Sequence, residues 1–150
     1  MIKPQNLLFI LSDEHNKNIM GCAGHPQIKT PNLDKLAKNG THFTNAYTPS
    51  PICVPARACL ATGKNVYQTG FWDNASPYDG SIKSWSHSLR ENGHEVTAIG
   101  KLHYRNDEDD SGFSESINNL YVPNGVGDVI GLVRENAPER GGAKKFATEI

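Results

Sequence analysis

Blocks of apolar residues separated by polar, turn-forming segments predict an α/β fold for this chain. Residues 6–11 (NLLFIL) form a short continuous apolar run, which is typical of a strand buried on both faces. Residues 41–48 (THFTNAYT) alternate in polarity, and both this segment and residues 95–104 (EVTAIGKLHY) predict further strands.

Three segments between and after these strands carry helix signals. Residues 30–40 (TPNLDKLAKNG) place a threonine at the cap, a proline at the first helical position and a glycine after the last turn. Residues 55–62 predict a second helix, and residues 82–94 (IKSWSHSLRENGH) predict a third that stops at Gly93. The resulting order, β-α-β-α-α-β, indicates an α/β fold with a largely parallel sheet.

Polar residues follow the first and the last of the predicted strands. Asp13 comes directly after the first apolar run, and Lys101 and His103 lie near the end of the last strand. Because binding sites in open α/β sheets gather beyond the carboxyl ends of the strands, these residues define a candidate site. On an extended strand end, Lys101 and His103 point the same way, since they are two residues apart.

The chain changes character after residue 105. Residues 106–116 (NDEDDSGFSES) predict a solvated acidic loop rather than a metal site, because the final glutamate of an EF-hand loop is missing. Residues 123–131 (PNGVGDVIG) contain GxG but not GxGxxG, which argues against a dinucleotide site. The last residues, 144–150 (KKFATEI), are typical of a helix.

Composition narrows the class of protein. The 150 residues suit a single domain, and the net charge of −1 gives no broad attraction to nucleic acid or anionic lipid. The first apolar run is too short for a secretory signal or a membrane helix, so we expect a soluble, cytoplasmic chain with no nucleic-acid or membrane partner. Three cysteines without a CxxC pair argue against a disulfide framework, and Cys22 with His25 lacks the spacing of a zinc site.

Cys53 raises the main chemical question. It could be a small buried side chain or a nucleophile at the start of the helix that follows it. The loop of a cysteine phosphatase is excluded, because its arginine stands six positions after the cysteine, whereas Arg57 is four positions away. A cysteine protease stays open on the residues alone, since six histidines could supply a base.

Several motifs in the correct order resemble the sulfatase family. Residues 53–57 (CVPAR) and 62–64 (TGK) are similar to its signature C-x-P-S-R followed by T-G-R or T-G-K, with alanine replacing the usual serine. The segment LLFILSDEH resembles the family's first strand with its acidic pair, and GHEVTAIGKLHY resembles its second signature. TPNLDKLAKNGTHFTNAYTPSPIC is similar to the lead into the modified cysteine, and GFWDN to the loop after it. Together these motifs cover residues 5 to 105.

The resemblance implies an alkaline-phosphatase-like sandwich, with a mostly parallel central sheet, helices on both faces and this chain as its N-terminal part. It also implies that a maturation enzyme oxidises Cys53 to formylglycine, an aldehyde that hydrates to a geminal diol. One hydroxyl of the diol attacks sulfur, and deprotonation of the other expels sulfate. This is covalent catalysis with its own release step.

The same resemblance assigns the metal ligands. Asp13, Glu14 and the modified residue 53 would hold a divalent cation, with Ca²⁺ preferred and Mg²⁺ or Mn²⁺ as alternatives, since all favour oxygen ligands. Glu14 stands where the family often has aspartate and sometimes glutamine.

Catalytic roles follow in the same way. Arg57 would hold the diol, Lys101 would contact the sulfate oxygens, and His103 would hydrogen-bond the diol and assist elimination. Lys64 would brace the site, and we interpret Cys22 and Cys59 as structural.

Further metal ligands in this family lie downstream of any motif seen here. We therefore expect residues 1–150 to be the N-terminal portion of a longer catalytic domain, inactive alone. The expected substrate is a small sulfate ester, such as choline sulfate or an aryl sulfate. Two other functions stay open: a phosphate or phosphonate monoester hydrolase, and a non-catalytic anion-binding module. A homo-oligomer is also open.

Overall fold

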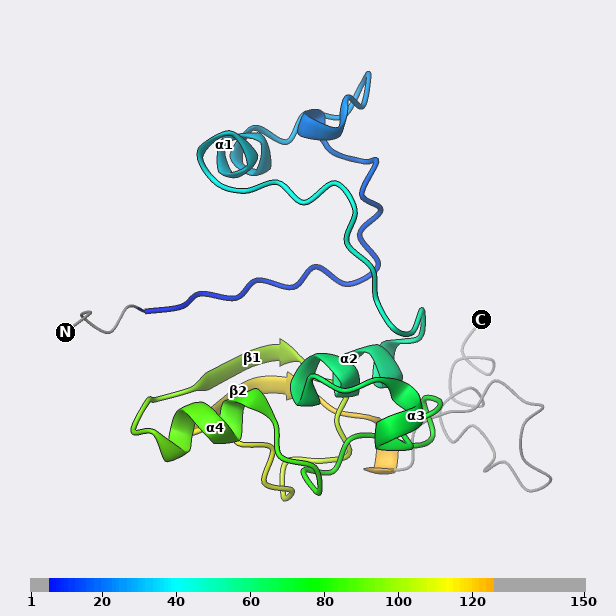
Figure 1. Ribbon diagram of the computed structural model, residues 1–150, viewed down its shortest axis with the longest axis vertical. Helices are drawn as coiled ribbons and strands as arrows, with labels where there is room; N and C mark the ends of the chain where they lie inside the picture. Colours follow the sequence, from blue (N-terminus) through cyan, green and yellow to red (C-terminus); the bar gives the residue numbers. More distant parts are fainter. Residues whose placement is uncertain (1–5, 126–150) are drawn as a thin grey trace, which may run out of the picture. The chain divides into compact units, whose positions relative to one another are not determined.

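Residues 6–125 are described by a computed structural model, which divides the chain into two units between Ala46 and Tyr47 (Figure 1). The described part of the first unit holds η1 (Gly21–Ala23) and α1 (Pro31–Asn39). The described part of the second unit holds, in order, α2 (Cys53–Thr62), α3 (Val66–Thr69), α4 (Trp85–Glu91), β1 (Thr97–Lys101), β2 (Glu115–Leu120) and η2 (Pro123–Gly125).

Two of the predicted strands are absent from the described residues. Residues 6–11 carry no strand pairing, and Leu8 is 82% exposed. Residues 41–48 are likewise irregular, with Phe43 75% exposed. Both predictions were wrong for the same reason. A strand is defined by hydrogen bonds to a neighbour, and the described part of the first unit offers no neighbouring strand.

The helix predicted after Thr30 is present as α1. The side chain of Thr30 does not cap the helix but donates from Oγ1 to Asp34 Oδ1 at 2.8 Å. The same carboxylate oxygen accepts the backbone N–H of Cys22 at 2.7 Å, and Thr30 Oγ1 accepts the N–H of Gly21 at 2.8 Å. The start of α1 is thereby joined to η1.

The second unit contains a parallel pair of strands, β1 and β2 (Figure 1). The predicted strand at 95–104 is confirmed as β1, whereas β2 was not predicted. Its sequence, ESINNL, is polar and contains two asparagines, which are depleted in strands, so pairing with β1 rather than local preference creates it. The solvated loop predicted over residues 106–116 therefore ends at Ser114, because β2 begins at Glu115.

A β-bulge lies beside the end of β1. Ile99 pairs with Ile117 and Lys101 pairs with Leu120, so two steps along β1 match three along β2. Asn118 takes up the extra residue with a left-handed φ of 49°. The carbonyl of Leu120 then accepts the N–H groups of both Leu102 and His103, at 3.2 and 2.8 Å. Bulges re-aim side chains next to sites, and this one fixes the chain just after Lys101.

The core of the second unit is small and aromatic. Tyr78 is fully buried, and its ring meets that of Tyr104 edge to face with centroids 4.8 Å apart. Ala58 and Ala61 of α2 pack against these rings, so the helix that begins at Cys53 is anchored on the core through its small residues.

The helix predicted over residues 82–94 is present as the shorter α4, which begins at a buried polar network. Ser84 is the N-cap, and its Oγ lies 2.6 Å from His87 Nδ1. Ser84 and Ser86 both donate to the carbonyl of Ser111, at 3.1 and 2.7 Å. Because these groups are buried, their hydrogen bonds tie α4 to the loop before β2.

Most of residues 106–116 form the predicted loop, and part of it is held by ion pairs. Arg105 contacts both Asp79 and Asp109. Within residues 6–125, no group of three histidine, cysteine, aspartate or glutamate side chains is placed to hold a metal. In the same range, no helix is long and apolar enough to cross a bilayer. The predicted helix at 144–150 lies outside the described residues.

Asp110 makes the stability of the second unit depend on pH in the acidic range. Arg90 donates to its two carboxylate oxygens at 2.9 and 2.6 Å, and the N–H of Gly112 donates at 2.9 Å. These donors lower the pKa of Asp110 to about 2. Because this pKa lies below the unfolded value of about 3.9, the stabilisation is present above pH 4 and is lost as the pH falls toward 2.

We expect Asp110→Asn to lower the thermal unfolding midpoint at pH 5 and to have a much smaller effect at pH 2. Asp107→Asn, at an exposed position of the same loop, is the matched control and should cause no pH-dependent difference. An equal shift of the Asp110→Asn midpoint at both pH values would contradict the assignment.

Candidate functional site

Cys53 is the first residue of α2. The helix is preceded by Ile52 in an extended conformation, and Pro55 stands in its first turn, where a missing N–H costs no hydrogen bond. Cys53 itself is partly exposed, in contrast to the fully buried residues that follow it. In this first turn the N–H of Val54 is bonded to Asn74 and Pro55 has no N–H, so the helix start favours an anion near Cys53 mainly through the positive end of its dipole.

Lys101, at the end of β1, reaches Cys53. Its Nζ lies 3.9 Å from the Cys53 Sγ, although the two residues are 48 positions apart. The sequence analysis placed both residues in one candidate site, and their side chains lie near each other in the structure. A cationic group therefore lies beside the Cys53 side chain.

Arg57 lies one helical turn beyond Cys53 and is 8% exposed. Its Nη1 donates to the backbone carbonyl of Lys101, so the guanidinium joins α2 to the end of β1. Burial raises the pKa of Tyr104, and the charge of Arg57 opposes that rise. Arg57 thus supports Lys101 as well as adding positive charge.

His103 follows Lys101 by two residues, but not on an extended strand. β1 ends at Lys101, and His103 has a left-handed φ of 56°. The alternation argument that both side chains point the same way was therefore wrong, because it requires β geometry at both residues. The N–H of His103 donates to Leu120, so the bulge holds this turn in place.

Asp13 and Glu14 belong to the first unit, in an exposed turn after residues 6–11. Glu14 has a φ of 55°. Among residues 6–125, the other non-glycine residues with positive φ are His103, Asn118 and Asn124, and asparagine tolerates this region well. Backbone strain of this kind clusters at functional sites, and here it coincides with two residues that the sequence had selected.

Cys59 and Cys22 have different surroundings from each other. Cys59 is buried, and burial raises the pKa of its thiol. Its surroundings are those of a structural residue, which is how the sequence analysis interpreted it. Cys22 is partly exposed and is tied through its backbone to Asp34. Lys64 is exposed, and its N–H donates to Thr62 Oγ1 at 3.3 Å.

Asn74 was not singled out from the sequence. Its Oδ1 accepts the backbone N–H of Val54 at 3.1 Å, directly beside Cys53. The sequence offered one signal for a turn here: Asp73, in the segment DNAS at residues 73–76, favours a turn at the end of the GFWDN loop. That signal does not identify the partner of Asn74.

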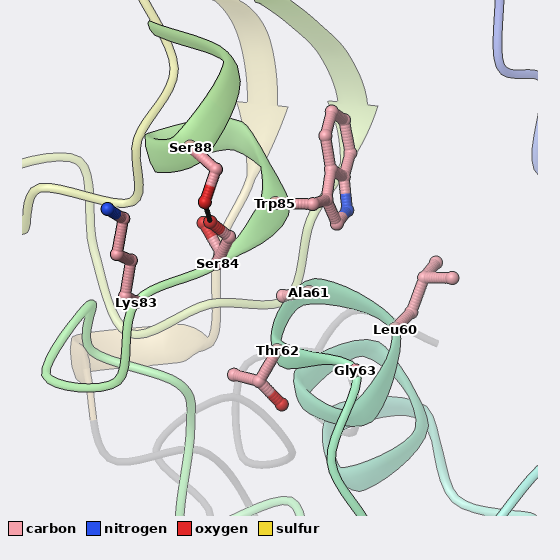
Figure 2. A pocket seen from close by; sticks show the side chains of 8 residues that line it. All are labelled: Leu60, Ala61, Thr62, Gly63, Lys83, Ser84, Trp85 and Ser88. Carbon is pink, nitrogen blue, oxygen red and sulfur yellow. Dashed lines mark hydrogen bonds between the residues drawn. The ribbon is translucent and has the colours of Figure 1, made fainter. Parts of the chain in front are cut away.

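An open hollow of about 310 Å³ lies between α2 and α4, away from Cys53 (Figure 2). Its wall includes Leu60–Gly63 at the C-terminal end of α2, together with Lys83, Trp85 and Ser88. Since a ten-residue helix is about 15 Å long, this hollow and Cys53 lie near opposite ends of α2. The candidate site is therefore not this hollow.

Comparisons with known proteins agree with this geometry. A family model described as sulfatase matches residues 5–136. N-acetylglucosamine-6-O-sulfatase of Bacteroides thetaiotaomicron is 38% identical over 101 residues, which are 67% of this chain and 18% of that protein. Choline-sulfatase of Rhizobium meliloti is 35% identical over 118 residues, which are 79% of this chain and 23% of that protein. The chain thus spans about a fifth of the length of these relatives.

Two solved structures are similar to this one. A protein in complex with its substrate D-glucosamine-2-N,6-O-disulfate has a TM-score of 0.64 and 36% identity, covering 69% of this chain and 21% of that one. Phosphonate monoester hydrolase of Agrobacterium radiobacter has a TM-score of 0.57 and 26% identity, covering 71% and 23%.

The parallel strands, the helices and these neighbours confirm the α/β, alkaline-phosphatase-like fold predicted from the sequence. The class of fold is therefore the alkaline-phosphatase-like one of these neighbours. Within that class, the chain belongs to the sulfatase family, as its motifs indicated.

Proposed function

We propose that the complete enzyme hydrolyses sulfate monoesters, with residue 53 as its nucleophile after oxidation of Cys53 to formylglycine. The observation that carries this proposal is the 3.9 Å approach of Lys101 Nζ to Cys53 Sγ at the start of α2, in a chain of the sulfatase family. A formylglycine at this position supplies a hydrated aldehyde, whose second hydroxyl allows the product to leave.

The chain's own residues then have separable roles. The Lys101 ammonium binds sulfate oxygens on which negative charge grows in the transition state. Arg57 holds the backbone at Lys101 and adds positive charge from a buried position. His103 exchanges a proton with the nucleophile or the leaving group, and the positive dipole end of α2 favours the bound anion.

Asp13, Glu14 and residue 53 are the proposed ligands of a divalent cation. The donor chemistry fits, because adjacent carboxylates suit Ca²⁺, Mg²⁺ and Mn²⁺ better than soft metals. When bound, such a cation supplies positive charge that stabilises the sulfuryl oxygens.

Removal of the metal tests the proposal directly. We expect chelation with EDTA to lower hydrolysis of 4-nitrophenyl sulfate by the complete, matured enzyme at least about 10²-fold, because Lewis-acid stabilisation contributes several kcal/mol. Added Ca²⁺ should restore the rate. Activity that is indifferent to chelation would contradict the metal assignment, and faster hydrolysis of a phosphate or phosphonate ester would favour the alternative reaction.

Maturation is tested by mass spectrometry of a peptide that contains residue 53. Converting CH₂SH to CHO lowers its mass by about 18 Da and creates the proposed nucleophile. We expect this loss when the protein is made together with a formylglycine-generating enzyme. An unmodified cysteine in fully active protein would exclude the proposed nucleophile.

A further inference from the structure

We propose that Asn74 is a positioning residue for the nucleophile: by accepting the backbone N–H of Val54, it fixes the first turn of α2 and the direction of the residue-53 side chain. The kinetic part of this inference rests on the proposed function. The structural part does not, and the two are tested separately below.

The helix needs an acceptor that its own N-cap does not supply. The first N–H groups of an α-helix have no partner within it, and an N-cap side chain usually accepts one of them. Here the N-cap is Ile52, which has no acceptor and makes no side-chain cap. Asn74, 20 residues further along the chain, provides the missing oxygen at 3.1 Å.

Water does not readily replace Asn74. Val54 is 1% exposed, and a buried donor without a partner costs about 1–3 kcal/mol. The bond from Val54 N to Asn74 Oδ1 therefore holds this turn together with the 3.0 Å backbone bond from Ala56 N to the carbonyl of Ile52.

The loop that carries Asn74 is itself held in place. Asp73 Oδ1 accepts the N–H of Ala75 at 2.9 Å and the hydroxyl of Ser76 at 3.0 Å, and the carbonyl of Asp73 accepts the N–H of Ser76 at 3.1 Å. Ala75 is buried. The acceptor is consequently presented from a fixed turn rather than from a free side chain.

The position of this bond determines its effect on chemistry. The N–H of Val54 belongs to the peptide group that joins Cys53 to Val54, so holding it also holds the backbone of Cys53. The opposite partner, Lys101, is held independently by Arg57. If the first turn frays, residue 53 moves relative to Lys101, and a displacement of about 1 Å can lower a rate 10²-fold.

The kinetic test compares Asn74→Ala with Asn74→Asp in the complete, matured enzyme. We expect Asn74→Ala to lower kcat for 4-nitrophenyl sulfate about 10- to 100-fold with KM changed less than about twofold, since the bond positions residue 53 and does not bind substrate. Asn74→Asp keeps an acceptor and should restore kcat to within about threefold, while its negative charge near the anion raises KM. Asn65→Ala, at the residue before α3, is the matched control and should leave kcat unchanged.

The structural test uses hydrogen exchange of a peptide covering residues 53–59, with the protein unfolding midpoint recorded alongside. Faster exchange in Asn74→Ala than in wild type and Asn74→Asp is the expected result. Unchanged exchange in Asn74→Ala would overturn the inference, even if the enzyme proved to act on another ester. An effect of Asn74→Ala on KM alone, or an Asn74→Asp kcat as low as that of Asn74→Ala, would also overturn it.

Discussion

Replacing Cys53 by alanine is expected to lower kcat/KM of the complete enzyme for 4-nitrophenyl sulfate at least about 10⁴-fold, the scale of loss when a covalent nucleophile is removed. Alanine has no sulfur to oxidise, so the aldehyde cannot form. Lys101 and Arg57 remain, and their contact through the Lys101 carbonyl does not involve residue 53. We therefore expect the loss in kcat rather than in substrate binding.

Cys22→Ala is the matched control for this change. Cys22 is also a free, partly exposed cysteine, but it lies in the first unit beside Asp34. Its replacement should leave kcat/KM within about twofold, because no step of the proposed reaction uses it. Comparable losses in the two variants would show that general damage, not the nucleophile, explains the Cys53 result.

Replacing Gly112 by alanine is expected to lower the free energy of unfolding by about 3–5 kcal/mol. A Cβ at this position would lie 2.3 Å from the His87 backbone nitrogen and 2.6 Å from its Nδ1. Gly112 also has a φ of 88°, which strains any other residue. Both Ser84 and Ser86 depend on the same contact between α4 and the loop.

Gly93→Ala separates the effect of the positive φ from the effect of the clash with His87. Gly93 has a φ of 80°, but a Cβ there would meet nothing within 4 Å. We expect it to lower the free energy of unfolding by only about 1 kcal/mol, the cost of the backbone conformation alone. Denaturant unfolding of both variants measures the difference, and equal losses would exclude the predicted clash with His87.

Local signals predicted the helices well. Pro31 at the start of α1 and Gly93 after α4 act over a few residues, so their meaning is readable from the sequence alone, although the predicted cap by the Thr30 side chain is not formed. The strands depended on distant partners. Residues 6–11 looked like a strand but are unpaired in the described part of the first unit, whereas the polar residues of β2 pair with β1.

In the candidate site, too, local motifs were readable from the sequence, whereas contacts between distant residues were not. The motif around Cys53 and the position of Lys101 identified a pair that the structure brings within 3.9 Å. The direction of His103 was not predictable, because nothing in the sequence marks the end of β1 at Lys101. Asn74 was missed because its contact with Val54 depends on a loop folding back over 20 residues.

The bulge at Asn118 bears on which insertions and deletions this segment could tolerate. Its extra residue shifts the register between β1 and β2 by one position. Since side chains along a strand alternate between its two faces, the register decides which face each one occupies. Losing one residue there would turn every later side chain of β2 to the opposite face and move the Leu120 carbonyl away from His103. Among homologous chains, the spacing between Ile117 and Leu120 should consequently vary less than the identity of the residues that fill it.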